Sequence, residues 1–193
     1  MRQIDPDLFS DYVKEFGFGE KVGLELTGES KGDIKNLLNK PVHELYAATA
    51  SFGQGLSVTP LQMVSAFSVI ANNGILMKPY LVKEIIKPDG AKIETSPKVI
   101  RRVISEKAAT MLGGMMVNVV ENGHGKKAAV KGYYVGGKTG TAQVARKGGY
   151  EDNINIGSFG GFAPVDDPKF VMLVRIDRPR NVEWAESSAA PLF

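Results

Sequence analysis

The chain has 193 residues, 43% of them hydrophobic, and a formal net charge of +3. A chain of this length can bury one sizeable core, and its hydrophobic content is typical of a globular protein rather than a disordered one. The sequence has no cysteine, which excludes disulfides and thiolate metal sites, and no sustained basic tract that would indicate binding to nucleic acid.

Two short helices are predicted in the first quarter of the chain. Asp5 is a typical N-cap residue and Pro6 suits the first helical position, so a helix should start there and end at Gly17. A second short helix is expected over 44–49. The connection between them is rich in turn-forming residues and predicts irregular structure.

A longer helix is predicted after Thr59. Pro60 suits its first position, Gln62 completes a capping box with Thr59, and Gly74 ends it. The apolar window 61–71 within it has about half the ~20 residues needed to cross a bilayer. We therefore expect a core helix, and neither a membrane span nor a targeting segment in this chain.

A hairpin and a second long helix should follow. The turn signal Pro88-Asp89-Gly90 joins two extended runs, 80–87 and 91–95. Ser105 caps a helix that should extend to about residue 122 and bury one apolar stripe. The methionines of this helix are predicted to be core residues; they are Met111, Met115 and Met116.

The last third of the chain changes to strands. Residues 131–135, 154–163 and 169–175 are separated by turn-rich linkers, one of them at Gly148-Gly149. This spacing predicts an antiparallel meander of three strands, with helices packed on it. The run 170–176 is largely apolar on both faces, so we predict that the strand at 169–175 is the innermost one.

The stretch from Val135 to Gln143 carries the strongest chemical signal. Its glycines allow a ligand to approach the backbone, while Lys138, Thr139 and Thr141 offer a cation and two hydroxyl donors. Such a site suits an anion. His124 is expected to be an exposed loop residue rather than a base.

Two different interpretations fit this stretch. Gly132 to Thr139 matches the phosphate-loop pattern of nucleotide-binding proteins letter for letter. A phosphate loop, however, requires a helix directly after it, and Gly140 falls where that helix should begin. In the alternative, Lys-Thr-Gly-Thr lies extended along a sheet edge and lines an acyl-transfer site.

Four motifs, in order, resemble one family. They are Ser-Phe-Gly-Gln-Gly-Leu-Ser-Val-Thr-Pro-Leu-Gln from Ser51, Glu-Asn-Gly-x-Gly-Lys-Lys-Ala from Glu121, Lys-Thr-Gly-Thr-Ala-Gln from Lys138, and Phe-Ala-Pro-x-x-x-Pro from Phe162. Together they resemble the transpeptidase domain of class B penicillin-binding proteins, the septal and elongation enzymes that cross-link peptidoglycan. The resemblance implies an α+β penicillin-binding/β-lactamase-like fold with no cofactor and no metal.

The resemblance also implies roles for site residues. In this family a serine of a Ser-x-x-Lys motif attacks a D-Ala-D-Ala stem peptide, and β-lactams mimic that substrate. Lys138 would hold its charge beside the serine of a Ser-x-Asn motif. Thr139, Gly140, Thr141 and Gln143 would bind the substrate, and the backbone N–H of Thr141 would be an oxyanion donor.

This sequence lacks both nucleophile motifs, because no serine lies three residues before a lysine or two before an asparagine. We therefore expect the chain alone to be inactive. The expected organisation is a single partial domain over 1–193, truncated at both ends. It should be mainly helical over 1–125, with a hairpin near 79–95, and carry antiparallel strands over 126–178.

The same resemblance sets expectations for partners. The parent protein would act at the extracytoplasmic face of the bacterial membrane, together with other cell-wall synthesis proteins. A non-catalytic interaction module of the same fold is a further alternative. Exposed sheet edges could drive dimerisation.

Overall fold

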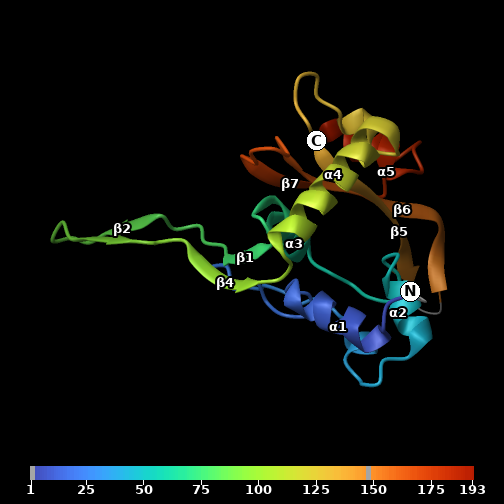
Figure 1. Ribbon diagram of the computed structural model, residues 1–193, viewed down its shortest axis with the longest axis horizontal. Helices are drawn as coiled ribbons and strands as arrows, with labels where there is room; N and C mark the ends of the chain where they lie inside the picture. The colour runs from blue at the N-terminus through green and yellow to red at the C-terminus, as the bar shows by residue number, and fades with distance from the viewer. Residues whose placement is uncertain (1–2, 147–148) are drawn as a thin grey trace. The chain divides into compact units, whose positions relative to one another are not determined.

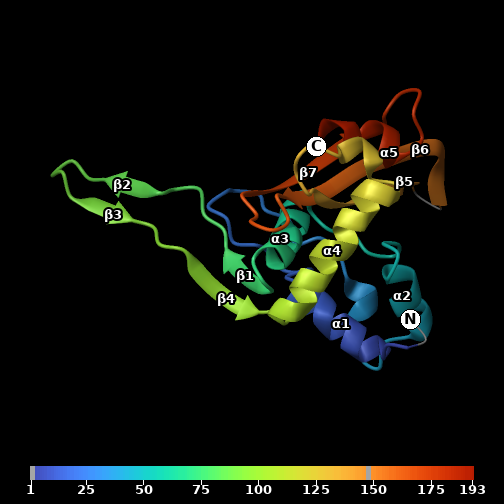
Figure 2. The same ribbon diagram turned by 45° about the horizontal axis from the view of Figure 1, so that its top comes forward.

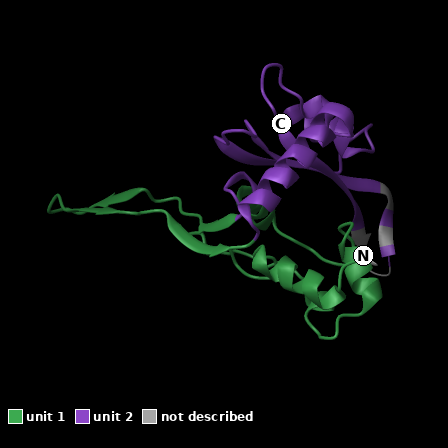
Figure 3. Ribbon diagram, viewed as in Figure 1, with its two compact units in different colours: residues 1–69, 75–103 green, residues 70–74, 104–193 purple. Residues whose placement is uncertain are grey.

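The computed structural model describes residues 3–146 and 149–193 (Figure 1). The chain divides into two compact units (Figure 3). Unit 1 comprises residues 1–69 and 75–103, and unit 2 comprises residues 70–74 and 104–193.

Unit 1 combines helices with two small antiparallel sheets. β1 pairs with β4, and β2 pairs with β3 as a hairpin around the predicted turn (Figure 2). The elements are α1 (Pro6–Glu15), the 3-10 helix η1 (Lys35–Leu37), α2 (Glu44–Ala50), α3 (Pro60–Ala71, whose last two residues fall in unit 2), β1 (Ile75–Lys78), β2 (Glu84–Ile86), β3 (Lys92–Glu94) and β4 (Lys98–Arg102).

The predicted helix starts are confirmed by side-chain caps. The Asp5 carboxylate accepts hydrogen bonds from the backbone N–H groups of Asp7 and Leu8, at 2.9 and 3.0 Å. The hydroxyl of Ser105 accepts from the N–H of Ala108 at 3.1 Å. Each cap satisfies donors that the first turn of a helix cannot pair internally.

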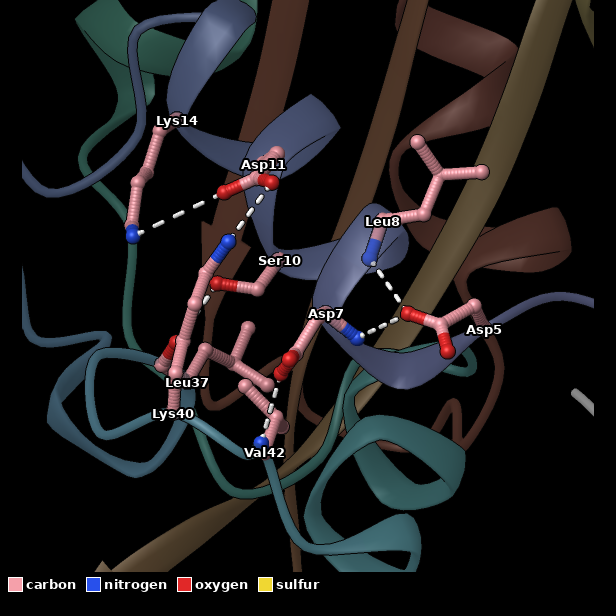
Figure 4. A network of polar contacts seen from close by, with 9 residues as sticks. All are labelled: Asp5, Asp7, Leu8, Ser10, Asp11, Lys14, Leu37, Lys40 and Val42. Atoms are coloured by element: carbon pink, nitrogen blue, oxygen red, sulfur yellow. Dashed lines mark hydrogen bonds and ion pairs between the residues drawn. The ribbon is translucent and has the colours of Figure 1, made fainter.

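Polar contacts tie α1 to η1 and to the segment that follows it (Figure 4). The hydroxyl of Ser10, fully buried, donates to the carbonyl of Leu37 at 2.5 Å, and the carboxylate of Asp7 accepts from the N–H of Val42 at 2.7 Å. At the surface, Lys40 pairs with Asp11 at 2.7 Å. A buried cluster lies beside these contacts; it contains Leu37, Val42, Ala47 and Ala50.

Gln62 holds an irregular segment onto α3. Its side-chain oxygen accepts a hydrogen bond from the N–H of Thr59 at 2.8 Å. In return, the hydroxyl of Thr59 accepts a hydrogen bond from the N–H of Gln62 at 3.1 Å. This is the predicted capping box. The side-chain amide also donates to the carbonyls of Glu20 and Lys31, at 2.8 and 3.0 Å, and the residue is only 1% exposed.

Unit 2 is built around the predicted three-strand meander. The sheet is antiparallel with strand order β5-β6-β7. The elements are α4 (Glu106–Asn122), η2 (Lys126–Ala128), β5 (Gly136–Arg146), β6 (Gly149–Ala163), β7 (Phe170–Asp177), α5 (Ala185–Ser188) and η3 (Ala190–Leu192).

The predicted order of burial within this sheet is wrong. The central strand is β6, not the strand at 169–175, and β6 carries the fully buried rings of Phe159 and Phe162. The first strand begins at Gly136 rather than at Lys131. The predicted turn at Gly148-Gly149 lies partly outside the described residues, because Gly148 is not among them.

The prediction of three core methionines on α4 is only partly correct. Met116 is buried on α4, but Met111 and Met115 are more than half exposed, so the prediction of three core methionines is wrong for two of them.

The ladder between β1 and β4 was not predicted. Among the described residues, no helix is both long and apolar enough to cross a membrane.

We predict that replacing Gln62 by leucine destabilises the fold by roughly 2–4 kcal/mol, because three backbone groups lose a partner in a buried setting. Urea unfolding measures this change. Gln143→Leu, on an exposed site, is the matched control and should change the free energy of unfolding by less than about 0.5 kcal/mol. Equal effects of the two variants would show that the buried bonds of Gln62 do not stabilise the fold.

A second prediction concerns two surface aspartates. The hydrogen bond from the Lys40 side chain lowers the pKa of Asp11, whereas the hydrogen bond from the Lys35 backbone is the main cause of the lowered pKa of Asp33. Lys40→Met should therefore return the pKa of Asp11 toward its ordinary value. Lys35→Met removes the side-chain contribution but keeps the backbone donor, the largest cause, so the pKa of Asp33 should stay below its ordinary value.

Carboxyl titration by NMR measures both pKa values. Because the folded-state pKa of Asp11 is depressed, its contribution to stability is present above the ordinary aspartate pKa and is lost as the pH falls through the lower value. Lys40→Met should weaken the fold only above that window. A larger pKa rise at Asp33 than at Asp11 would contradict the assignment of causes.

Candidate functional site

The first residues of β5 lie unusually close to the core of unit 2. A Cβ atom on Gly137 would lie 2.3 Å from Cζ of Phe159, and one on Gly136 would lie 2.8 Å from Cγ2 of Val165. Neither distance is compatible with a side chain. The two glycines therefore let the backbone of β5 pack directly on the buried ring of Phe159 and on the half-buried Val165.

The predicted site residues lie next to one another on β5. In the ladder with β6, Lys138 faces Gly160 and Thr141 faces Gly157. β5 is the edge strand of the sheet, so within the described chain no strand pairs with its outer side. Because side chains alternate along a strand, Thr139, Thr141 and Gln143 share one face and Lys138 projects to the other.

Lys138 supplies an exposed positive charge beside this edge. Its ammonium group donates a hydrogen bond to the carbonyl of Thr139 at 2.9 Å. Among the described residues, no carboxylate forms an ion pair with it. An ammonium group has three donors, so Lys138 keeps hydrogen-bonding capacity for an anionic or hydroxyl partner.

Thr141 connects β5 to the last helical segment. Its hydroxyl accepts a hydrogen bond from the N–H of Ala185 at 3.1 Å, where α5 begins. Opposite Thr141, a Cβ on Gly157 would lie 2.4 Å from the hydroxyl oxygen of Ser188, so α5 packs closely on β6 as well. Sequence reasoning missed this contact, and no local signal links residues 44 positions apart.

The other predicted residues, Thr139, Gly140 and Gln143, also lie on β5. Thr139 is half-buried, and the carbonyl of Gly140 accepts from the hydroxyl of Ser158 at 3.2 Å. Gln143 is exposed, and the register shifts between it and Ala145. Such irregularities bend a strand, and they often occur beside functional sites.

The phosphate-loop interpretation of Gly132 to Thr139 is wrong. Residues 136–146 form one continuous strand, whereas a phosphate loop requires a helix N-terminus directly after the lysine and threonine. Without that helix, the backbone N–H groups do not converge on a phosphate. The correct interpretation is the extended sheet edge.

The remaining polar candidates lie at the surface. The side chain of His124 is 87% exposed, as predicted, and its Nδ1 lies 3.1 Å from the carboxylate of Glu186. The described residues contain no group of three or more histidines, aspartates or glutamates that could hold a metal ion.

The geometry suits an extended, anionic ligand. A peptide can add to an open sheet edge through main-chain hydrogen bonds, while threonine hydroxyls and a cation at the same edge bind a carboxylate. β5 offers all three kinds of group over Lys138 to Thr141. No serine of this chain has a lysine partner in the expected spacing, so the edge supplies binding groups without the expected nucleophile.

Several known proteins are similar to this chain in sequence. The chain matches the family described as penicillin binding protein transpeptidase domain over residues 1–193. It is 44% identical to stage V sporulation protein D of Bacillus subtilis over 184 residues, covering 94% of this chain and 28% of that protein. It is 34% identical to a probable peptidoglycan D,D-transpeptidase, PenA, of Neisseria meningitidis, covering 88% of this chain and 27% of that protein.

Solved structures share its fold. The crystal structure of penicillin-binding protein 3 from Mycobacterium tuberculosis, without ligand, matches with a TM-score of 0.90 and 34% identity, covering all of this chain and 45% of that one. The same protein complexed with ampicillin matches with a TM-score of 0.88 and 33% identity, covering 99% of this chain and 44% of that one.

These matches confirm the predicted fold class, an α+β transpeptidase fold with an antiparallel three-strand sheet. The chain spans 28% and 27% of the length of the two curated relatives named above. Because the family match extends over every residue, the chain belongs to the penicillin-binding protein transpeptidase domain family.

Proposed function

We propose that this chain forms one wall of the acyl-transfer site of a D,D-transpeptidase that cross-links peptidoglycan. The observation that carries the proposal is the open edge of β5, where Lys138 to Thr141 present a cation, two hydroxyls and main-chain groups together. The substrate is a stem peptide that ends in D-Ala-D-Ala. We propose that β-lactams bind the same edge; that a similar protein was solved in complex with ampicillin supports β-lactam binding in the family.

Each residue of the edge has a distinct task in this proposal. The hydroxyls of Thr139 and Thr141 bind the terminal carboxylate, with Gly140 and Gln143 beside it. Lys138 places its charge next to the serine of a Ser-x-Asn motif. On an edge strand, alternate residues direct their N–H outward, and we assign Thr141 to that set. Its N–H then stabilises the oxyanion of the tetrahedral intermediate.

The covalent step requires a serine from outside this chain. That serine attacks the carbonyl carbon of the penultimate D-alanine, the terminal D-alanine leaves with a proton, and an amine from a second stem peptide resolves the acyl-enzyme. The protein that contains the chain acts at the extracytoplasmic face of the bacterial membrane, where peptidoglycan is assembled, together with other cell-wall synthesis proteins.

We predict that the chain alone forms no covalent adduct with a fluorescent penicillin, because it lacks Ser-x-x-Lys. Gel fluorescence after denaturation measures the adduct. The complete gene product that contains the chain should form one adduct per molecule. A stoichiometric adduct on the chain alone would refute the assignment of the nucleophile. If the complete product stays unlabelled, the protein is an interaction module of the same fold.

A second prediction tests Thr141 in the complete gene product. Thr141→Pro removes the backbone N–H and should slow acylation by penicillin about 10²–10³-fold. Thr141→Val keeps the N–H but loses the hydroxyl, so it serves as the matched control and should slow acylation much less. Stopped-flow fluorescence gives both rates, and circular dichroism checks the fold.

The two variants separate the possible outcomes. Proline is tolerated on an edge strand where the N–H faces outward, so Thr141→Pro should fold. Unfolding of Thr141→Pro, with Thr141→Val folded and fast, would mean that this N–H belongs to the ladder with β6. Equal acylation rates in both variants would refute the oxyanion role.

A further inference from the structure

The hairpin β2–β3 of unit 1 is a two-stranded arm with an open edge. It extends from the β1–β4 ladder in both views (Figures 1 and 2), and every residue from Leu81 to Glu94 is exposed. The sheet contains only these two strands, so within the described chain the outer edge of β3 has no strand partner. Unpaired edges of this kind are templates for pairing with another chain.

The charges of the hairpin are unbalanced at one position. Glu84 and Glu94 face each other across the two strands, which places like charges directly opposite. Lys92 forms an ion pair with Glu84 at 3.5 Å. Among the described residues, no cation pairs with Glu94. The hairpin therefore carries an unpaired carboxylate at its open edge.

A second copy of β3 complements this edge. In an antiparallel pair of two β3 strands centred on Ile93, each Ile93 faces its counterpart, and each Lys92 faces the Glu94 of the other copy. Each Glu94 then gains a cation from a Lys92 that also pairs with Glu84 of its own hairpin, and two exposed isoleucines form a cross-strand apolar pair. The row of exposed isoleucines on that face, Ile85 and Ile93 from each copy, becomes continuous.

Three other strand edges suit such a pair less well. The same antiparallel arrangement for β2, centred on Ile85, places Lys83 opposite Lys87 of the other copy. β5 contains no acidic residue over 136–146. On β7, a pair centred on Ile176 would also place Arg175 opposite Asp177 of the other copy, but Asp177 already has a cation, because Arg175 of its own strand lies 3.1 Å away, whereas Glu94 has none. The charge pattern thus favours β3 as the pairing edge.

We propose that two copies of this protein associate through their β3 strands and form a four-stranded antiparallel sheet in the order β2-β3-β3-β2. The interface consists of main-chain hydrogen bonds, the Ile93 pair and two Lys92–Glu94 ion pairs. It is small and its charges are exposed, so the dimer is weak and weakens with added salt.

Cysteine cross-linking tests the register. The chain has no native cysteine, so Ile93→Cys introduces a single thiol. Residues directly opposite in an antiparallel pair have Cα atoms about 4.5–5.5 Å apart, which suits a disulfide. Ile93→Cys should therefore form a disulfide-linked dimer under mild oxidation. Ile85→Cys, equally exposed on β2, is the matched control and should cross-link at least tenfold more slowly.

Charge exchange tests the ion pairs. In sedimentation velocity at low salt, Lys92→Glu and Glu94→Lys should each abolish the dimer, because like charges then meet twice. The double variant Lys92→Glu/Glu94→Lys should restore it, and Lys98→Glu on exposed β4 is the control for net charge. A wild-type chain that stays monomeric at about 1 mM, equal cross-linking at both cysteines, or no rescue by the double variant would overturn the proposal.

Discussion

The close packing of β5 on Phe159 is the constraint on which the rest of unit 2 depends. Phe159 is fully buried, and the ring leaves no room for a side chain at Gly137. The backbone of β5 can therefore approach the ring this closely only with glycine at position 137. This close approach sets the ladder with β6, leaves the other side of β5 open, and brings Thr141 to the start of α5. Binding groups on a strand held this firmly are preorganised.

The features predicted from sequence are those with local causes. The caps at Asp5, Thr59 and Ser105, and the turn at Pro88 to Gly90, each depend on residues within a few positions of one another. The Lys-Thr-Gly-Thr motif was likewise found, and its placement on a strand was correct, because Gly140 disfavours a helix.

The features that sequence reasoning missed depend on distant residues. β6 is the central strand although its sequence is rich in glycine and polar residues. Its glycine at position 157 packs against α5, and its rings at Phe159 and Phe162 are buried, so its burial depends on contacts with residues far along the chain. The β1–β4 ladder joins segments separated by the whole hairpin. No sequence pattern indicated that the side chain of Gln62 would donate hydrogen bonds to the carbonyls of Glu20 and Lys31. Such pairings become visible only when the chain is folded.

The hydrogen bond between Thr141 and Ala185 has a consequence for the direction of the threonine proton. A hydroxyl has one proton and two lone pairs. Because the N–H of Ala185 occupies a lone pair, rotation about the C–O bond is biased, and the proton of Thr141 points away from α5. Accepting one hydrogen bond also polarises the O–H group and makes it a better donor. The final helical segment thereby gives the hydroxyl its polarity before any ligand arrives.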